Sequence, residues 1–227
     1  MIRKLATLGC MAAMTAFAAP ASALTVGAAS AGNCYPFSCG PTDGVTEWQQ
    51  VYASSAFPGA LSFSAVSFTQ FTGYIPGPNM DSATYAVSFY LTSATVTSLS
   101  SSLASNEGAS LGLLGTFTLG GPQPSVLTLN GANISYDPSL GNLLMDVVIS
   151  NPTVIYPSYQ NFFNADYVQA VTARAWNSTG YGDFGASSGG LQTTFGAVPE
   201  ASTWAMMLAG FAGLGMVGYR RRKALAA

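Results

Sequence analysis

The stretch Tyr85-Ala-Val-Ser-Phe-Tyr-Leu91 places a large apolar side chain at every second position. Alternate side chains of an extended chain point to the same face, so this spacing predicts a β-strand with one buried face. Residues 143–149 are nearly continuous apolar sequence, broken only by Asp146, and predict a buried strand of a sandwich. We expect Asp146 either to face outward or to take a structural hydrogen bond.

Turn-forming dipeptides separate further apolar runs, and no segment between them shows a sustained helical stripe. Asn130-Gly131 lies between two such runs, 126–129 and 132–136, and predicts a two-residue hairpin. Residues 161–168 are expected to form a short helix or a turn. Altogether about eight to ten strands with regular turn signals predict an all-β fold, an antiparallel β-sandwich of the jelly-roll kind.

Composition divides the chain into four parts. Residues 1–23 are typical of a secretory signal peptide, with two cations, an apolar run and an Ala21-Ser22-Ala23 site for signal peptidase. A lipoprotein signal at Cys10 is disfavoured because the apolar run continues past it. The sandwich ectodomain is expected over 24–184, a Gly/Ser/Thr-rich last strand and linker over 185–197, and a sorting tail over 198–223.

The charge of the body excludes several classes of function. Between the two targeting segments there are one basic residue, Arg174, and eight acidic residues, a net charge of −7. Such a surface repels nucleic acid, so no nucleic-acid partner is expected. The chain has no histidine and the body no lysine, which removes Ser-His-Asp catalysis, histidine-bound zinc and Schiff-base chemistry. Paired carboxylates remain as a glycosidase mechanism, but we expect the protein not to be an enzyme.

The two cysteines of the body predict a disulfide. Cys34 and Cys39 are separated by four residues, and export through an oxidising compartment favours their pairing. A loop this short is expected to act as a local staple near the N-terminus rather than as the main source of stability.

Two sets of side chains are candidates for binding. Asp137 and Asp183 are weak calcium candidates, since no EF-hand loop is present, and otherwise no metal or cofactor is expected. Aromatic residues are dense between 151 and 182, and exposed rings flanked by polar groups are one way to stack on sugars. The candidate glycan contacts are Tyr156, Tyr159, Tyr167 and Trp176. The competing expectation, which we favour, is that most of these rings fill the core.

The C-terminal tail has the pattern of a membrane segment. Residues 204–219 carry no charge and, as a helix, would extend about 24 Å, slightly less than a bilayer core. Trp204 and Tyr219 lie at its two ends, and the basic block 220–223 is expected to stay cytoplasmic. We therefore predict a transmembrane helix over 203–219. On hydropathy alone, a simple membrane anchor remains an alternative.

The residues of this tail resemble the PEP-CTERM sorting signal of Gram-negative bacteria, most closely its alphaproteobacterial form. Pro199-Glu200 matches the head of that motif, although Ala201 stands where a second proline is usual. The other residues that the resemblance marks for recognition are Trp204, Gly210, Phe211, Arg220, Arg221 and Arg222. The resemblance implies cutting near Pro199 by exosortase, a membrane-embedded enzyme, with this chain as its substrate.

The two targeting signals together predict how the protein is handled. It would cross the inner membrane, lose its signal peptide, be held transiently by the C-terminal helix, and then reach the cell surface or extracellular matrix. We expect a structural or adhesive role there. The alternative is a carbohydrate-binding module associated with exopolysaccharide.

Overall fold

The computed structural model describes residues 23–73, 79–153, 161–168 and 170–196. Its elements are strands of 2 to 13 residues and three short 3₁₀ helices, and the described residues contain no α-helix. In chain order they are β1 (Leu24–Val26), β2 (Ala31–Asn33), β3 (Val45–Tyr52), η1 (Ser54–Ala56), β4 (Leu61–Thr69), β5 (Met80–Thr92), η2 (Leu103–Asn106), β6 (Ser110–Gly121), β7 (Val126–Tyr136), η3 (Pro138–Leu140), β8 (Asn142–Thr153), β9 (Phe163–Asp166), β10 (Thr172–Ser178), β11 (Phe184–Ser187), β12 (Gly190–Leu191) and β13 (Thr193–Gly196).

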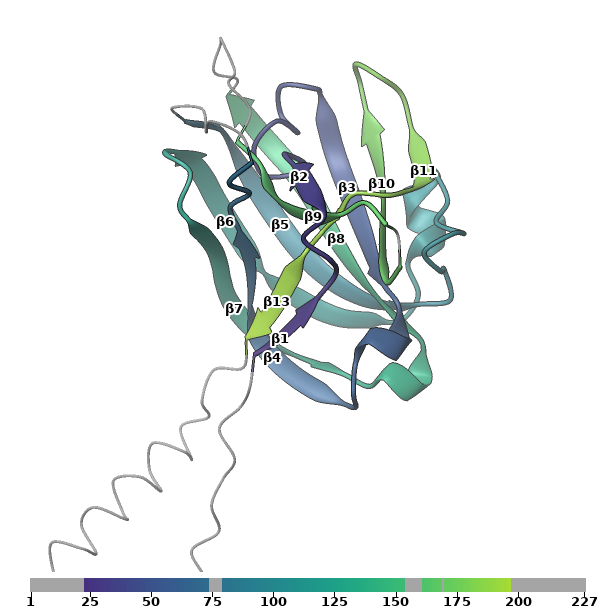
Figure 1. Ribbon diagram of the computed structural model, residues 1–227. Coiled ribbons are helices and arrows are strands. Elements are labelled where there is room, and N and C mark those ends of the chain that lie inside the picture. The colour runs from purple at the N-terminus through teal and green to yellow at the C-terminus, as the bar shows by residue number, and fades with distance from the viewer. Residues whose placement is uncertain (1–22, 74–78, 154–160, 169, 197–227) are drawn as a thin grey trace, which may run out of the picture. The chain divides into compact units, whose positions relative to one another are not determined.

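The strands form three antiparallel sheets (Figure 1). A four-stranded sheet has the order β1-β13-β4-β7, and a six-stranded sheet has the order β11-β10-β3-β8-β5-β6. The third sheet, β12-β9-β2, is small. The predicted all-β, antiparallel fold is therefore confirmed, whereas the jelly-roll connectivity stays a prediction.

Aromatic side chains join the two larger sheets. The ring of Phe63 on β4 lies 5.0 Å from that of Phe89 on β5, measured between centroids. Phe195 on β13 similarly lies 5.2 Å from Tyr52 on β3. All four side chains are buried. The sheets therefore pack face to face, with Phe89 contributed by the alternating strand predicted from the sequence.

The outer face of the six-stranded sheet is partly covered by the connection between β5 and β6, residues 93–109, which we call the strap. Along β3, Tyr52 points to the main core, whereas Val51 points to this outer face. Leu99 and Leu103 of the strap pack against Val51 and Leu144 in a second, smaller apolar cluster. The sandwich thus buries part of both faces of one sheet.

The small sheet and the cysteine loop cover one side of the main core. The buried Gln50 side chain accepts from Leu191 N at 2.5 Å and donates to Leu191 O at 2.8 Å, which ties β12 to β3. Cys34 and Cys39 form the predicted disulfide. Between them, Phe37 is fully buried and lies 4.9 Å from the Phe68 ring. The stapled loop therefore places an aromatic side chain in the core.

The predicted hairpin at Asn130-Gly131 is wrong. Both residues lie inside β7, where the register with β4 shifts between Phe63 and Ala65. A Cβ added at Gly131 would stand 1.9 Å from the Leu114 carbonyl oxygen. Gly131 is thus required because β6 approaches the backbone of β7 closely at a bulge. Glycine within a strand often marks such a site.

Residues 163–166 form β9, so the short helix or turn expected over 161–168 is also wrong. β9 pairs with β2 on one side and with β12 on the other, and this pairing outweighs the weak local preference of the segment for a helix or turn. Toward the C-terminus, the expected last strand is present: β12 and β13 together extend to Gly196.

Several predictions concern residues outside the described ranges. These are the signal peptide up to residue 22, the transmembrane helix 203–219 and the basic tail 220–223. Within the described part of the chain, no helix has the length and apolar character needed to cross a membrane.

Candidate functional site

The one cation of the body is the centre of an aromatic cluster. Arg174 lies on the core-facing side of β10, opposite Gln50 of β3, and is largely buried. Its guanidinium donates to Ser188 O at 2.9 Å and to Asn33 Oδ1 at 2.8 Å. Its burial lowers the pKa of the guanidinium. The cation is nevertheless retained, because backbone and amide oxygens and two rings surround it.

Two rings pack against this guanidinium, and a third ring stacks on one of them. Arg174 Cζ lies 4.7 Å from the centroid of the Trp176 ring and 5.5 Å from that of Tyr35. Phe184 of β11 stacks on Trp176 with centroids 4.6 Å apart and planes inclined by 18°. Trp176 is only 8 % exposed, whereas Phe184 is 39 % exposed. The outer layer of the stack is therefore Phe184, and its free face is open to solvent.

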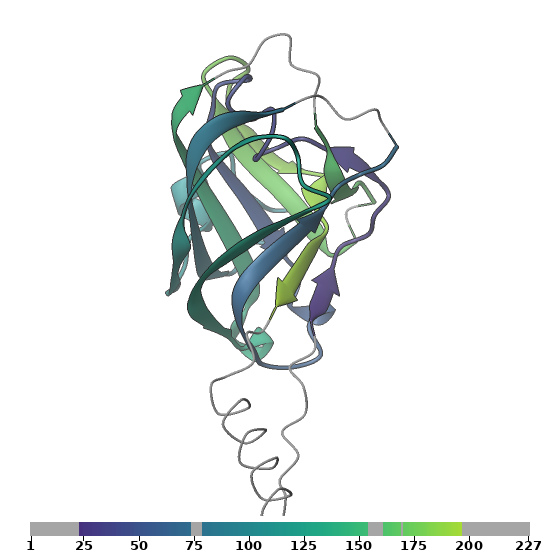
Figure 2. The ribbon, with the colours of Figure 1, turned by 90° about the vertical axis from the view of Figure 1, so that its left-hand side faces the viewer.

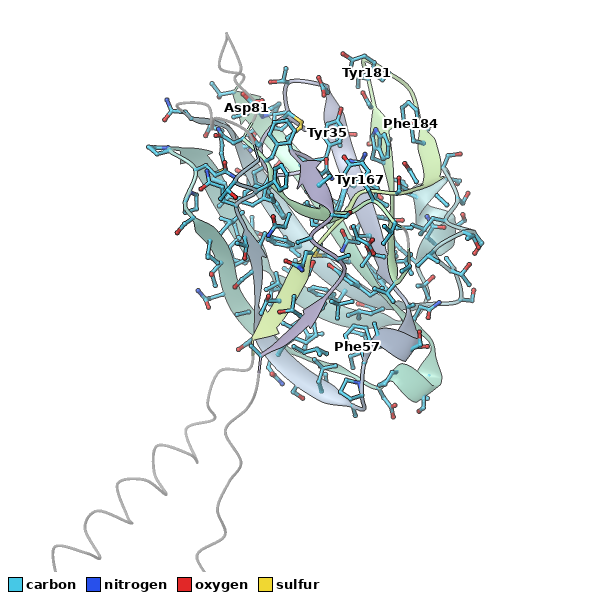
Figure 3. The ribbon with its side chains drawn as sticks, viewed as in Figure 1. Tyr35, Phe57, Asp81, Tyr167, Tyr181 and Phe184 are labelled. Carbon is cyan, nitrogen blue, oxygen red and sulfur yellow. A yellow bond between two sulfur atoms is a disulfide. The ribbon has the colours of Figure 1, made fainter. Side chains whose placement is uncertain are left out.

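Two tyrosines extend the exposed aromatic surface (Figure 3). Tyr181, in the turn between β10 and β11, is exposed. Burial and the hydrogen bond that Tyr35 donates to Asp43 are the main causes that raise the pKa of Tyr35, and the phenol of Tyr181 adds to them. Tyr167 is also exposed and its hydroxyl donates to Gly32 O at 3.3 Å. We define Tyr35, Tyr167, Trp176, Tyr181 and Phe184 as the aromatic cluster.

The four predicted glycan contacts have different outcomes. Tyr167 belongs to the exposed surface, whereas Trp176 is buried beneath Phe184. Tyr156 and Tyr159 lie outside the described residues. Sequence reasoning did not propose Phe184 or Tyr35, because neither the β10–β11 pairing nor the approach of the cysteine loop can be read from local pattern. In addition, Trp176 lies opposite Phe184 only because the register between β10 and β11 shifts between Arg174 and Trp176.

The two calcium candidates lie in different turns. Asp137 precedes η3, and its carboxylate accepts from Ser139 N at 2.9 Å. The hydrogen bond of the Ser139 side chain, followed by this backbone one, lowers the pKa of Asp137. Asp183 is exposed in the turn that leads to β11. The carboxylates that the structure does bring together in its described part are three others.

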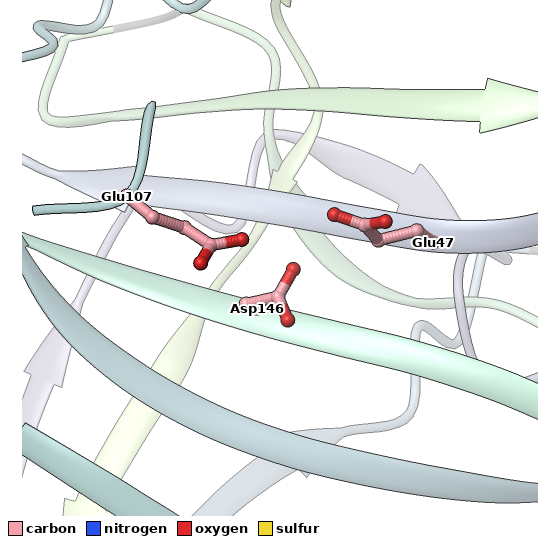
Figure 4. Close-up of side chains that lie close together, drawn as sticks. All are labelled: Glu47, Glu107 and Asp146. Atoms are coloured by element: carbon pink, nitrogen blue, oxygen red, sulfur yellow. The ribbon is translucent and has the colours of Figure 1, made fainter. Parts of the chain in front are cut away.

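Glu47, Glu107 and Asp146 form an acidic cluster beneath the strap (Figure 4). They come from β3, the end of the strap and β8, and one carboxylate oxygen of each lies within 4.8 Å of the others. Asp146 accepts a hydrogen bond from Gln49 Nε2 at 3.2 Å. The expectation that Asp146 takes a structural hydrogen bond is therefore confirmed. Asn106 of the strap donates to Gln49 Oε1 at 2.9 Å and completes the chain of contacts.

Burial and like charge shift the titration of this acidic cluster. Asp146 is 4 % exposed, and burial is the main reason that its pKa is raised to about 7. The hydrogen bond from Gln49 opposes this shift, while the charges of Glu47 and Glu107 add to it. Burial, followed by the charge of Glu107, also raises the pKa of Glu47. Near neutral pH the cluster therefore holds a proton that an isolated aspartate would have lost.

The comparisons with known proteins identify the end of the chain. A family model described as the PEP-CTERM protein-sorting motif matches residues 197–223, which begin directly after the last residue of β13. Among curated proteins and among solved structures, nothing matches the chain at a significant level. The motif implies export, processing by exosortase and a surface or extracellular location. The chain thus carries a PEP-CTERM sorting motif and is an exosortase-targeted extracellular protein.

Proposed function

We propose that the chain is the precursor of a non-catalytic protein of the extracellular matrix. Signal peptidase releases it after Ala23, the segment 203–219 holds it in the membrane, and exosortase cuts near Pro199. The mature sandwich then has a structural or adhesive role and requires no cofactor. The observation that carries this proposal is the sorting motif at 197–223, placed next to the end of a folded β-domain.

The chemistry of the body supports a non-catalytic role. The chain has no histidine, which leaves carboxylates as the main acid–base groups. The acidic cluster brings three of them together, but Asp146 is buried beneath the strap. A glycosidase needs both carboxyl groups to reach the scissile bond of a sugar. A buried Asp146 does not meet that requirement, which leaves the half-buried Glu47 and Glu107 as the one remaining pair in this cluster.

Mass spectrometry of the mature protein tests the processing. We expect an N-terminus at Leu24 and loss of the segment that begins near Pro199. The double variant Pro199→Ala/Glu200→Ala should keep the intact C-terminus, whereas the neighbouring control Ser202→Ala/Thr203→Ala should be processed. Recovery of wild-type protein from the cell surface with Ala227 still present would reduce the tail to an ordinary anchor.

The aromatic cluster favours carbohydrate binding as a second candidate function. Phe184 presents a free ring face while its other face is fixed against Trp176, so little conformational entropy would be lost on stacking against a sugar. Tyr167 and Tyr181 add exposed rings with polar tips. An adhesive role would then consist of holding exopolysaccharide at this surface.

Glycan-array binding and co-sedimentation with exopolysaccharide test this second function. Phe184→Ala and Tyr181→Ala should each weaken binding about tenfold, a loss typical of one stacked ring. Leu113→Ala, an exposed side chain on β6, serves as the control and should bind normally. Absence of binding by the wild-type protein would leave the structural role as the proposal.

A further inference from the structure

Both ends of the folded body leave from one pole of the sandwich. In the pairing of β1 with β13, Leu24 lies opposite Phe195, so the first and last strands end side by side (Figure 1). Figure 2 shows the same two strand ends from a perpendicular direction. We call this end the terminal pole. It is formed by β1, β13, the beginning of β4 and the turns at η1 and η3.

The last strand is held firmly in place. β13 pairs with β1 on one side and with β4 on the other, so it is not an edge strand. Phe195 is 1 % exposed and its ring contacts those of Tyr52, Phe57 and Phe63 at centroid distances of 5.2, 5.6 and 4.9 Å. Detaching β13 would remove an aromatic side chain from the centre of the core, a cost of several kcal/mol. The strand is therefore expected to remain folded during processing.

Chain length then limits the distance between the pole and the cutting enzyme. Only residues 197 and 198 separate Gly196, the end of β13, from Pro199. Even a fully extended chain would span at most about 11 Å from Gly196 to Pro199. An enzyme that encloses the bond near Pro199 must therefore bring its own surface against the terminal pole.

The terminal pole has the chemistry of an apolar contact surface. Two adjoining hollows of about 330 and 370 Å³ lie there and share Ala60, Leu61 and Ser62. Among the described residues that line them, Asp137 has the one charged side chain, in a body of net charge −7. Leu140 lines one hollow and is 68 % exposed. An exposed leucine beside hollows lined mainly by apolar side chains suits the apolar centre of a protein interface.

We propose that the terminal pole is the surface through which the folded sandwich contacts exosortase while the bond near Pro199 is cut. The contact rests on the exosortase processing proposed above, and adds to it a role for the body outside the sorting motif. Apolar side chains at Leu61 and Leu140 meet the extracytoplasmic surface of the enzyme, and β13 stays paired throughout.

Processing rates of the full-length precursor test the contact. Leu140→Asp places a charge in the pole at an exposed position, and we expect it to slow cleavage about tenfold, as loss of one apolar anchor would. Val168→Asp changes a side chain that is 63 % exposed and lines neither hollow, and should be cut at the wild-type rate. Pulse-chase labelling in cells that contain exosortase measures both rates.

A second pair of precursors separates contact from misfolding. Twelve Gly/Ser residues inserted after Gly196 add a mean reach of about 20 Å, which lets the enzyme act away from the pole. With this insertion, Leu140→Asp should be cut as fast as the same precursor without the substitution. Equal slowing with and without the insertion would show a folding defect and overturn the proposal.

The remaining outcomes assign the failure. If wild-type precursor is not cut near Pro199, the processing itself is wrong. If wild-type precursor is cut and the Leu140→Asp and Val168→Asp variants are cut at the same rate, the processing stands and the proposed contact surface is overturned. If mature protein floats with phosphatidylcholine vesicles that lack enzyme, and Leu140→Asp abolishes this, the occupant of the pole is lipid and the proposal also fails.

Discussion

The main core and the cluster beneath the strap are built on opposite faces of the same sheet, yet they are closed by different chemistry. Between the two large sheets, Phe63, Phe89 and Phe195 pack ring against ring, and no carboxylate takes part in these contacts. Beneath the strap, the apolar residues are smaller, mostly Leu, Val and Ala, and the acidic cluster adjoins them. The ring contacts between the sheets are apolar, whereas the strap is also held by hydrogen bonds that end on a carboxylate.

This difference teaches which part of the fold depends on conditions. Apolar burial varies little with pH, whereas three carboxylates within 4.8 Å repel one another once they all ionise. The strap is held across the Asn106–Gln49–Asp146 hydrogen bonds, in which the acceptor carboxylate titrates near neutrality. We therefore expect the main core to set global stability and the strap to respond to pH. Three measurements can break or sharpen this comparison.

The largest effect is expected from Phe63→Ala in the main core. Phe63 is 1 % exposed and contacts the ring of Phe89 across the sandwich and that of Phe195 in its own sheet, so its removal leaves a cavity between the sheets. The free energy of unfolding of the mature protein should fall by about 4 kcal/mol. Denaturant titration at constant pH measures this loss.

Phe184→Ala is the matched control for this core substitution. The same ring is removed from the exposed aromatic cluster, where solvent already reaches one face, and the loss should stay below about 1 kcal/mol. Equal losses for the two variants would mean that the ring contacts between the sheets do not dominate stability.

The next effect in size is a pH dependence carried by Asp146. Its pKa is raised to about 7 in the folded protein, so the folded state binds a proton that the unfolded state releases near pH 4. This contribution to stability is fully present below about pH 4 and is lost as pH rises through 7. The free energy of unfolding should fall by about 3 kcal/mol between pH 4 and pH 8. Glu47, whose pKa is also raised, acts in the same direction.

Asp146→Asn isolates this contribution, because the amide keeps the shape of the side chain but cannot ionise. The variant should be more stable than the wild type at pH 8 and should show a flatter pH profile. Asp183→Asn removes one charge from an exposed turn and should leave the wild-type profile in place. A profile that stays steep in Asp146→Asn would assign the pH dependence to another group.

The same comparison explains how far the sequence could be read. The main core follows period-two alternation, so Tyr85, Phe89 and their strand were predicted together with the β class. The disulfide Cys34–Cys39 was also predictable, because its partners are local and the body has no other cysteine. The sorting motif was predictable for the same reason: its residues are contiguous.

Features that depend on tertiary register were not predictable. Gly131 has the local signal of a hairpin, but the approach of Leu114 from another strand makes it part of a bulge. The acidic cluster joins residues that are 39, 60 and 99 positions apart, and the sequence marks only Asp146, as an interruption of its apolar strand. Phe184 could not be recognised because its stacking on Trp176 depends on the register shift between β10 and β11.

The smallest effect is expected from Leu103→Ala in the strap, and it should be local. Leu103 packs on the outer face of the sheet within a 3₁₀ turn, which can collapse onto a truncated side chain more readily than two rigid sheets. Opening of the strap should become easier by about 2 kcal/mol. Hydrogen exchange of peptides from 93–109 should therefore accelerate, while peptides from β4 exchange as in the wild type. Ser101→Ala, at an exposed position of the strap, is the control.

If the two regions are closed as argued, hydrogen exchange of the strap in the wild type should also be faster at pH 8 than at pH 5 after correction for intrinsic exchange rates. Asp146→Asn should remove that difference, and acceleration of β4 together with the strap would mean that they open as one unit.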